Sequence, residues 1–165
     1  MLLVVLSGAL FWAHNFIHTQ VHDQLAEQRI NFPPSGSAAL AALPEADRTA
    51  VSQYAGQQLL TGAQAEVFAD HYIGAHLKKA TGGKTYAELS SASLANPSDA
   101  KLAAQVQTAF RGETLRGLLL NAYAFDTMAL VASYIGIGSL LAATILAVLA
   151  VLGFGHSKVA SKRRK

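Results

Sequence analysis

The residues best suited to chemistry are three histidines, His14, His18 and His22, which recur at every fourth position near the start of the chain. In a helix this spacing places the side chains on one face, with a drift of about 40° per step. Neutral imidazole is a good ligand for zinc, copper or haem iron. The ladder therefore supports a metal- or haem-binding membrane protein as one hypothesis. The alternative is an interfacial or structural role, because the ladder begins beside Trp12 and Asn15, where an apolar stretch ends.

A metal site would need further ligands, and the candidates are Asp23 or Asp70 with His71 or His76. The two later histidines are five positions apart, so on a helix they point to different faces and form a weak pair by themselves. The spacing alone therefore does not define a complete ligand set.

A second motif, Gly82-Gly83-Lys84-Thr85, resembles the end of a phosphate-binding P-loop. That motif requires a glycine at the position occupied here by Lys78, and it follows a strand that this sequence lacks. We interpret the segment as a helix stop followed by a cap, and we expect no nucleotide partner.

The acidic residues offer no catalytic pair. Glu113 lies between Arg111 and Arg116, which is typical of a solvated charge cluster, and Asp126 is expected at the membrane interface, at the start of a span. Cysteine is absent, and no serine stands in a nucleophile context. We therefore predict a protein that is not an enzyme, with no catalytic, cofactor-binding or metal residue assigned and no cofactor.

The elements that carry these residues are those of a membrane protein. The chain is 52% hydrophobic and 14% charged, against about 25% charged in soluble domains. Residues 127–155 contain no charge, and this run exceeds the roughly 20 residues that cross a bilayer. Residues 1–17 form a second apolar stretch of about 25 Å, slightly short for a span. We expect a retained helix rather than a cleaved signal, either short or beginning upstream of Met1.

Basic residues follow the second apolar run: Lys158, Lys162, Arg163, Arg164 and Lys165. A basic tail in this place indicates a cytoplasmic C-terminus. A nucleic-acid-binding protein would carry its basic residues on the folded domain, so no nucleic-acid partner is expected. We predict a multi-pass plasma-membrane protein with both termini in the cytoplasm and an extracytoplasmic central region.

The pattern predicts an all-α fold, because no run of alternating strand character occurs. Two capping boxes are expected, Thr61 with Gln64 and Thr85 with Glu88, and Gly82 should stop the helix between them. The expected helices are residues 1–30 ending before Pro33, 44–60, 61–81, 85–94, 100–110, and a last helix from Glu113 through the apolar run.

The predicted architecture is a transmembrane hairpin with a stalk and lobe of short helices. Its segments are an N-terminal span (1–18), an extracytoplasmic region (19–126), a second span (127–155) and a basic cytoplasmic tail (156–165). Small residues line one stripe of the second span: Ala129, Ala132, Gly136, Ser139, Ala143 and Ala147. Such a stripe packs either on the chain's own first helix or on another membrane protein or second copy.

Three stretches carry a resemblance to known proteins: His22–Pro34, Lys79–Leu89 and Phe110–Tyr123. They resemble a family of small actinobacterial two-span membrane proteins, some of which are labelled aromatic ring-opening dioxygenases. The resemblance implies a cell-envelope location and no activity. A ring-opening enzyme needs two histidines and a carboxylate around iron, a set that this sequence does not offer at a recognisable spacing.

Together these features predict a non-enzymatic accessory or structural subunit that docks onto a larger membrane complex. Its partners would be the lipid bilayer and other membrane-protein subunits or a second copy of itself. Phe32, Pro33, Pro34 and the Leu118–Leu120 region are candidate partner contacts, with internal packing as the alternative. Two alternatives remain open: the histidine-ladder metal or haem protein, and a self-assembling scaffold or channel.

Overall fold

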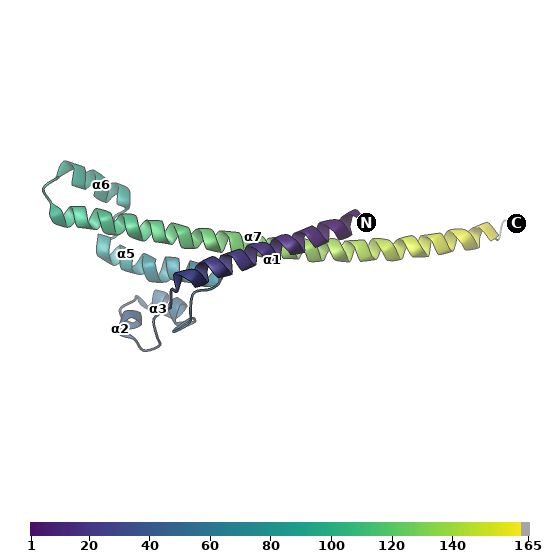
Figure 1. Ribbon diagram of the computed structural model, residues 1–165, viewed down its shortest axis with the longest axis horizontal. Helices are drawn as coiled ribbons and strands as arrows, with labels where there is room; N and C mark the ends of the chain where they lie inside the picture. Colours follow the sequence, from purple (N-terminus) through teal and green to yellow (C-terminus); the bar gives the residue numbers. More distant parts are fainter. Residues whose placement is uncertain (163–165) are drawn as a thin grey trace. The chain divides into compact units, whose positions relative to one another are not determined.

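The computed structural model describes residues 1–162, with side chains through residue 156 and at residue 158 (Figure 1). The elements within this range are α1 (Leu2–Gln28), α2 (Ala38–Ala41), α3 (Glu45–Ser52), α4 (Gly62–Val67), the π-helical segment η1 (Phe68–Ile73), α5 (Gly74–Thr81), α6 (Tyr86–Ala95) and α7 (Ala100–Lys162). Extended pairing in this range is limited to one isolated bridge, between Asn31 and Gln58. The all-α prediction is confirmed for the described residues. Three of the basic tail residues, Arg163, Arg164 and Lys165, lie outside them.

The chain divides into two compact units. One combines Met1–His18 with Met128–Lys165, and the other is Thr19–Thr127, which we call the lobe. Each unit is described by itself below.

The first unit is built on an antiparallel helix pair. The Ser7 hydroxyl donates to the Gly136 carbonyl at 2.9 Å, and His14 Nδ1 lies 2.9 Å from the Ala129 carbonyl. The contact residues therefore lie further toward the C-terminus in α1 as they lie further toward the N-terminus in α7, so the two helices run antiparallel. Ala129 is fully buried, and a Cβ on Gly136 would lie 3.4 Å from Leu10. The small residues bring the two backbones close, which favours packing on the chain's own first helix as the explanation of the stripe.

The outward faces of this pair remain uncovered. Both α1 and α7 are long and apolar enough to cross a membrane, and only 6% of the most apolar window of each is buried. A core helix of a soluble protein would be mostly buried instead. Large apolar side chains such as Val5, Leu141 and Ile145 are at least 60% exposed. The unit therefore presents an apolar surface of the kind that lipid covers.

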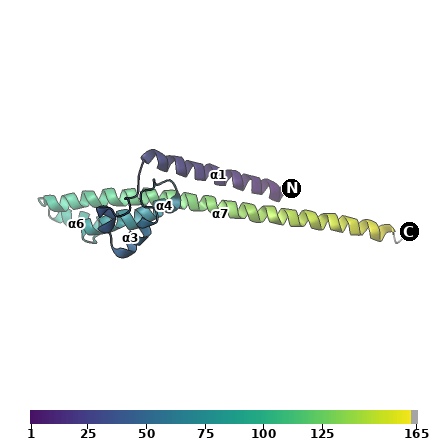
Figure 2. The same ribbon diagram turned by 90° about the horizontal axis from the view of Figure 1, so that it is seen from below.

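The lobe is held together by helices that pack along the N-terminal part of α7. The segments α4, η1 and α5 follow one another without interruption, and the Leu77 side chain lies against Gly112 of α7. Both views show α6 beside the first turns of α7 (Figures 1 and 2), where the rings of Tyr86 and Phe110 are 5.8 Å apart. The largest fully buried side chains are Phe32, Leu59, Leu89 and Val51.

Local capping signals located several helix ends correctly. Thr61 with Gln64 and Thr85 with Glu88 both form complete capping boxes. Gly82 adopts a left-handed conformation with φ of 63° and ends α5, as predicted.

Two predicted boundaries are wrong. The helix expected over residues 44–60 ends at Ser52, because Gly56 turns the chain at φ of 72° and Leu59 then donates to the Ile30 carbonyl at 2.9 Å. The break expected between residues 110 and 113 does not occur, and α7 is continuous. Gly112 serves there as a contact surface for Leu77 rather than as a helix stop.

Candidate functional site

The histidine ladder is built on α1, and its members have different surroundings. A carbonyl can only accept, so the Nδ1 of His14 must donate to Ala129, which leaves Nε2 unprotonated in the neutral ring. The His14 and His18 rings stack with centroids 5.8 Å apart. His22 Nδ1 lies 3.1 Å from an Asp23 carboxylate oxygen at an exposed site.

The additional ligands suggested by the sequence have other partners. Asp70 pairs with Arg116, His71 pairs with Asp47, and His76 Nδ1 donates to the Tyr72 carbonyl at 2.8 Å. Across the described residues there is no group of three or more His, Cys, Asp or Glu side chains that could hold a metal ion. The geometry thus adds no support to the metal or haem hypothesis.

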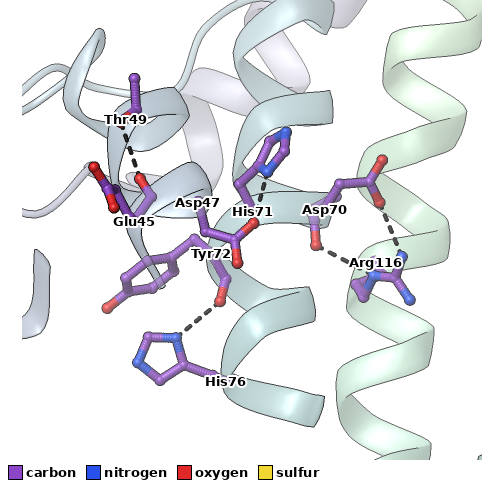
Figure 3. A network of polar contacts seen from close by, with 9 residues as sticks. Glu45, Asp47, Thr49, Asp70, His71, Tyr72, His76 and Arg116 are labelled. Carbon is purple, nitrogen blue, oxygen red and sulfur yellow. Dashed lines mark hydrogen bonds and ion pairs between the residues drawn. The ribbon is translucent and has the colours of Figure 1, made fainter. Parts of the chain in front are cut away.

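The lobe brings together a polar network of which the local sequence indicated only the proximity of Glu113 and Arg116 (Figure 3). We call it the Arg116 network. The Arg116 guanidinium lies 2.9 Å from an Asp70 oxygen and 3.0 Å from a Glu113 oxygen, and its Nε donates to the Ala69 carbonyl at 3.2 Å. Its side chain is 27% exposed. The pKa of Arg116 is raised above its ordinary value, chiefly by the hydrogen bond to Asp70 and against partial desolvation.

The π-helical segment η1 is part of this arrangement. The Gly74 N–H donates to Ala69, one residue further back than in an α-helix, and Arg116 donates to the same carbonyl. A Cβ on Gly74 would lie 3.5 Å from the Arg116 Nε, in ordinary van der Waals contact, so the guanidinium packs directly against this glycine. π-helical turns interrupt the regular backbone ladder and often mark special sites. Here the Ala69 carbonyl links η1 to Arg116 of α7.

A contact between Asp47 of α3 and His71 of η1 adds a third helix to this arrangement. His71 Nδ1 lies 2.8 Å from a carboxylate oxygen of Asp47 (Figure 3). A cleft of about 400 Å³ lies beside the network, and it is lined by three carboxylates and three cations: Asp47, Asp70, Glu113, Lys78, Lys84 and Arg116. The pair of Asp47 with His71 connects α3 to η1, and the pair of Asp70 with Arg116 connects η1 to α7. Glu113 pairs with Arg116 on α7 itself. The arrangement is therefore suited to bracing α3, η1 and α7 against one another.

Asp126 has a structural partner that the sequence did not suggest. Its carboxylate is buried within the lobe and accepts from the Gly62 N–H at 3.0 Å, in the first turn of α4. An anion is favoured at this end of a helix. Asp126, which was expected at the membrane interface, thus links the start of α4 to α7.

The predicted partner contacts separate into two groups. Phe32 and Pro33 are buried, which supports internal packing for them, whereas Pro34 is exposed. Leu119 is 4% exposed and Leu118 is 60% exposed. Of the apolar leucine region, Leu118 therefore offers the largest free surface.

Comparisons with protein-family models, curated proteins and solved structures find no match. Any statement about function therefore depends on the geometry of this chain.

Proposed function

We propose that the chain is an integral membrane protein, anchored by a hairpin of two spans, whose lobe faces away from the cytoplasm and docks onto a larger membrane complex as a non-enzymatic accessory subunit. The observation that carries the membrane part is the antiparallel pair of α1 and α7, with small residues inside and large apolar side chains outside. This pair needs lipid around it, since exposed apolar surface of this extent is unfavourable in water.

The pair also bears on whether α1 is a signal sequence. A cleaved leader makes no lasting contacts, whereas Ser7 and His14 each bond a carbonyl of α7. These contacts support a retained first span. Because antiparallel spans return the chain to its starting side, the basic residues after residue 155 favour cytoplasmic termini and an extracytoplasmic lobe.

The docking part of the proposal depends on the lobe surface. Leu94 is 80% exposed, Phe110 53% and Tyr86 42%, and the rings of the last two lie side by side. Uncovered apolar side chains are candidates for protein contacts, and the rings of Tyr86 and Phe110 place two of them next to each other. The stripe on α7 is a weaker candidate for docking, because Ala129 and Gly136 already pack on α1.

Two measurements test the proposal. Because cysteine is absent, single cysteines at Ser98 and Ser161 allow labelling with a membrane-impermeant reagent in intact cells. We expect labelling at Ser98 and none at Ser161, and the reverse pattern would refute the topology.

Docking is tested by purifying a tagged chain from native membranes in mild detergent. We expect other membrane subunits in fixed stoichiometry, and their loss when Leu94 and Phe110 are both changed to Ser. An exposed-site control, Val131→Ser, should keep them. Recovery of the chain alone would contradict the accessory role.

A further inference from the structure

An apolar groove of about 630 Å³ lies within the lobe, between the last turns of α1 and the middle of α7. This volume is within the range of about 300–1,000 Å³ that is usual for small-molecule sites. We propose that the groove binds the aliphatic chain of an uncharged membrane lipid. This inference rests on the membrane anchoring proposed above but does not depend on the accessory role.

The groove has a buried floor and an apolar rim. Leu25, Phe68 and Leu119 form the floor and are each at most 8% exposed. Leu118 and Phe125 stand at the rim, 60% and 53% exposed. Covering such a rim removes apolar surface from water, which is favourable. An aliphatic chain lying in the groove would provide that cover.

The lining restricts the charge of the ligand. It contains no acidic residue, basic residue or histidine, and its polar side chains are the amides of Gln24, Gln28 and Asn121. A charged group drawn into this groove would lose its hydration without gaining a counter-charge. Amides can donate to an ester carbonyl and can accept from a hydroxyl. The chemistry therefore fits a neutral glycerolipid, such as a diacylglycerol, better than a fatty acid.

The groove is long enough to hold an extended aliphatic chain. The α7 residues that line it, from Leu115 to Phe125, extend over about 15 Å.

The position in the chain provides a source for this ligand. Phe125 stands two residues before the uncharged segment 127–155, on the same continuous helix. α1 likewise continues from the apolar residues 1–17 to the groove residue Val21. In a membrane-anchored chain the lipid supply is therefore close to the groove.

The test uses the full chain in phospholipid nanodiscs that contain a diacylglycerol with a photoreactive diazirine on one acyl chain. After irradiation, mass spectrometry maps the adducts. We expect adducts on residues 21–30 and 115–125. Excess unlabelled diacylglycerol should suppress them, and palmitate, which carries a charge, should not. Adducts confined to residues 1–17 and 127–155 would show only bilayer contact and would overturn the proposal, as would equal suppression by palmitate.

Matched variants locate the site. Ala122 lines the groove and Ala124 is exposed outside the lining. Ala122→Phe should displace about two methylene groups and lower the groove adducts about tenfold. Ala124→Phe should leave them unchanged. If Ala122→Phe does not fold, Leu118→Gln should lower the adducts, with Leu94→Gln as its control. Unchanged adducts in a folded groove variant would refute the site, while copurification would still test the accessory role separately.

Discussion

Gly62, where α4 packs against α7, gives a sharp test of the packing of the lobe. A Cβ added to this glycine would lie 2.5 Å from Cβ of Asp126 and 2.8 Å from its Oδ2. Carbon atoms in contact normally lie about 3.5–4.0 Å apart, so Gly62→Ala must push α4 and α7 apart by about 1 Å. The 3.0 Å hydrogen bond from the Gly62 N–H to Asp126 would then be lost.

The expected cost follows from these changes. Overpacking costs about 1–3 kcal/mol, and a hydrogen bond to a charged group contributes about 1.5–3 kcal/mol. Alanine regains up to about 1 kcal/mol of helix propensity over glycine. We expect Gly62→Ala to lower the free energy of opening of the lobe by about 2–4 kcal/mol.

Hydrogen exchange measured by mass spectrometry in detergent micelles reports this free energy locally. Amides of residues 62–81 should exchange at least about 30-fold faster in the variant. Two glycines of α7 provide matched controls. Gly112→Ala meets only the flexible end of Leu77, at 2.7 Å, and should cost less, while Gly117→Ala meets nothing within 4 Å and should slow exchange slightly. Equal effects at Gly62 and Gly117 would refute the contact with Asp126.

Three further predictions concern the network, the second capping box and the helix pair. Arg116→Met should lower the free energy of local opening by about 1–3 kcal/mol, measured by amide exchange across residues 68–77. Arg116→Lys should lower it by less. If amide exchange stayed unchanged in both variants, the bracing role would be contradicted. The pKa of Glu88 is lowered below 4.5, first by its hydrogen bond to the Thr85 backbone. The contribution of Glu88 to the protection of α6 should therefore be fully present above pH 4.5 and fall as the pH drops through the lowered value, and Glu88→Gln should abolish this dependence. Gly136→Leu should loosen the pair of α1 and α7, which would broaden the distribution of distances between spin labels at Val5 and Ile137. Gly138→Leu, where an added Cβ meets nothing within 4 Å, should leave that distribution unchanged. The opposite ranking would reject the assigned packing face.

The parts of the fold that depend on local chemistry could be predicted from the sequence. A capping box needs only residues three positions apart, and Gly82 needs only its own freedom at positive φ. The two apolar helices follow from composition. These signals act within a few residues, so a single sequence contains them completely.

The parts that depend on distant contacts could not be predicted. The early end of α3 reflects pairing of residues 57–59 with residues 30–32, which no local pattern announces. Arg116 and Asp70 are 46 positions apart, and neither residue's neighbours indicate the other. The continuity of α7 between residues 110 and 113 was missed, and the contact of Gly112 with Leu77 comes from another helix, so no local pattern indicates it. The histidine ladder was visible in the spacing, but spacing cannot tell whether further ligands converge on it.

The π-helical segment also affects how the chain tolerates changes in length. Residues 68–73 contain one residue more per turn than a regular helix needs, so they hold a surplus residue between α4 and α5. Because the wide turn absorbs this residue, deleting one residue there would restore regular winding and leave α5 in nearly the same orientation relative to α4. The same deletion within α5, which is regularly wound, would turn the residues after it by about 100°. A chain shortened within residues 68–73 would thus keep Leu77 on the surface of Gly112, whereas one shortened just before Leu77 would lose that contact.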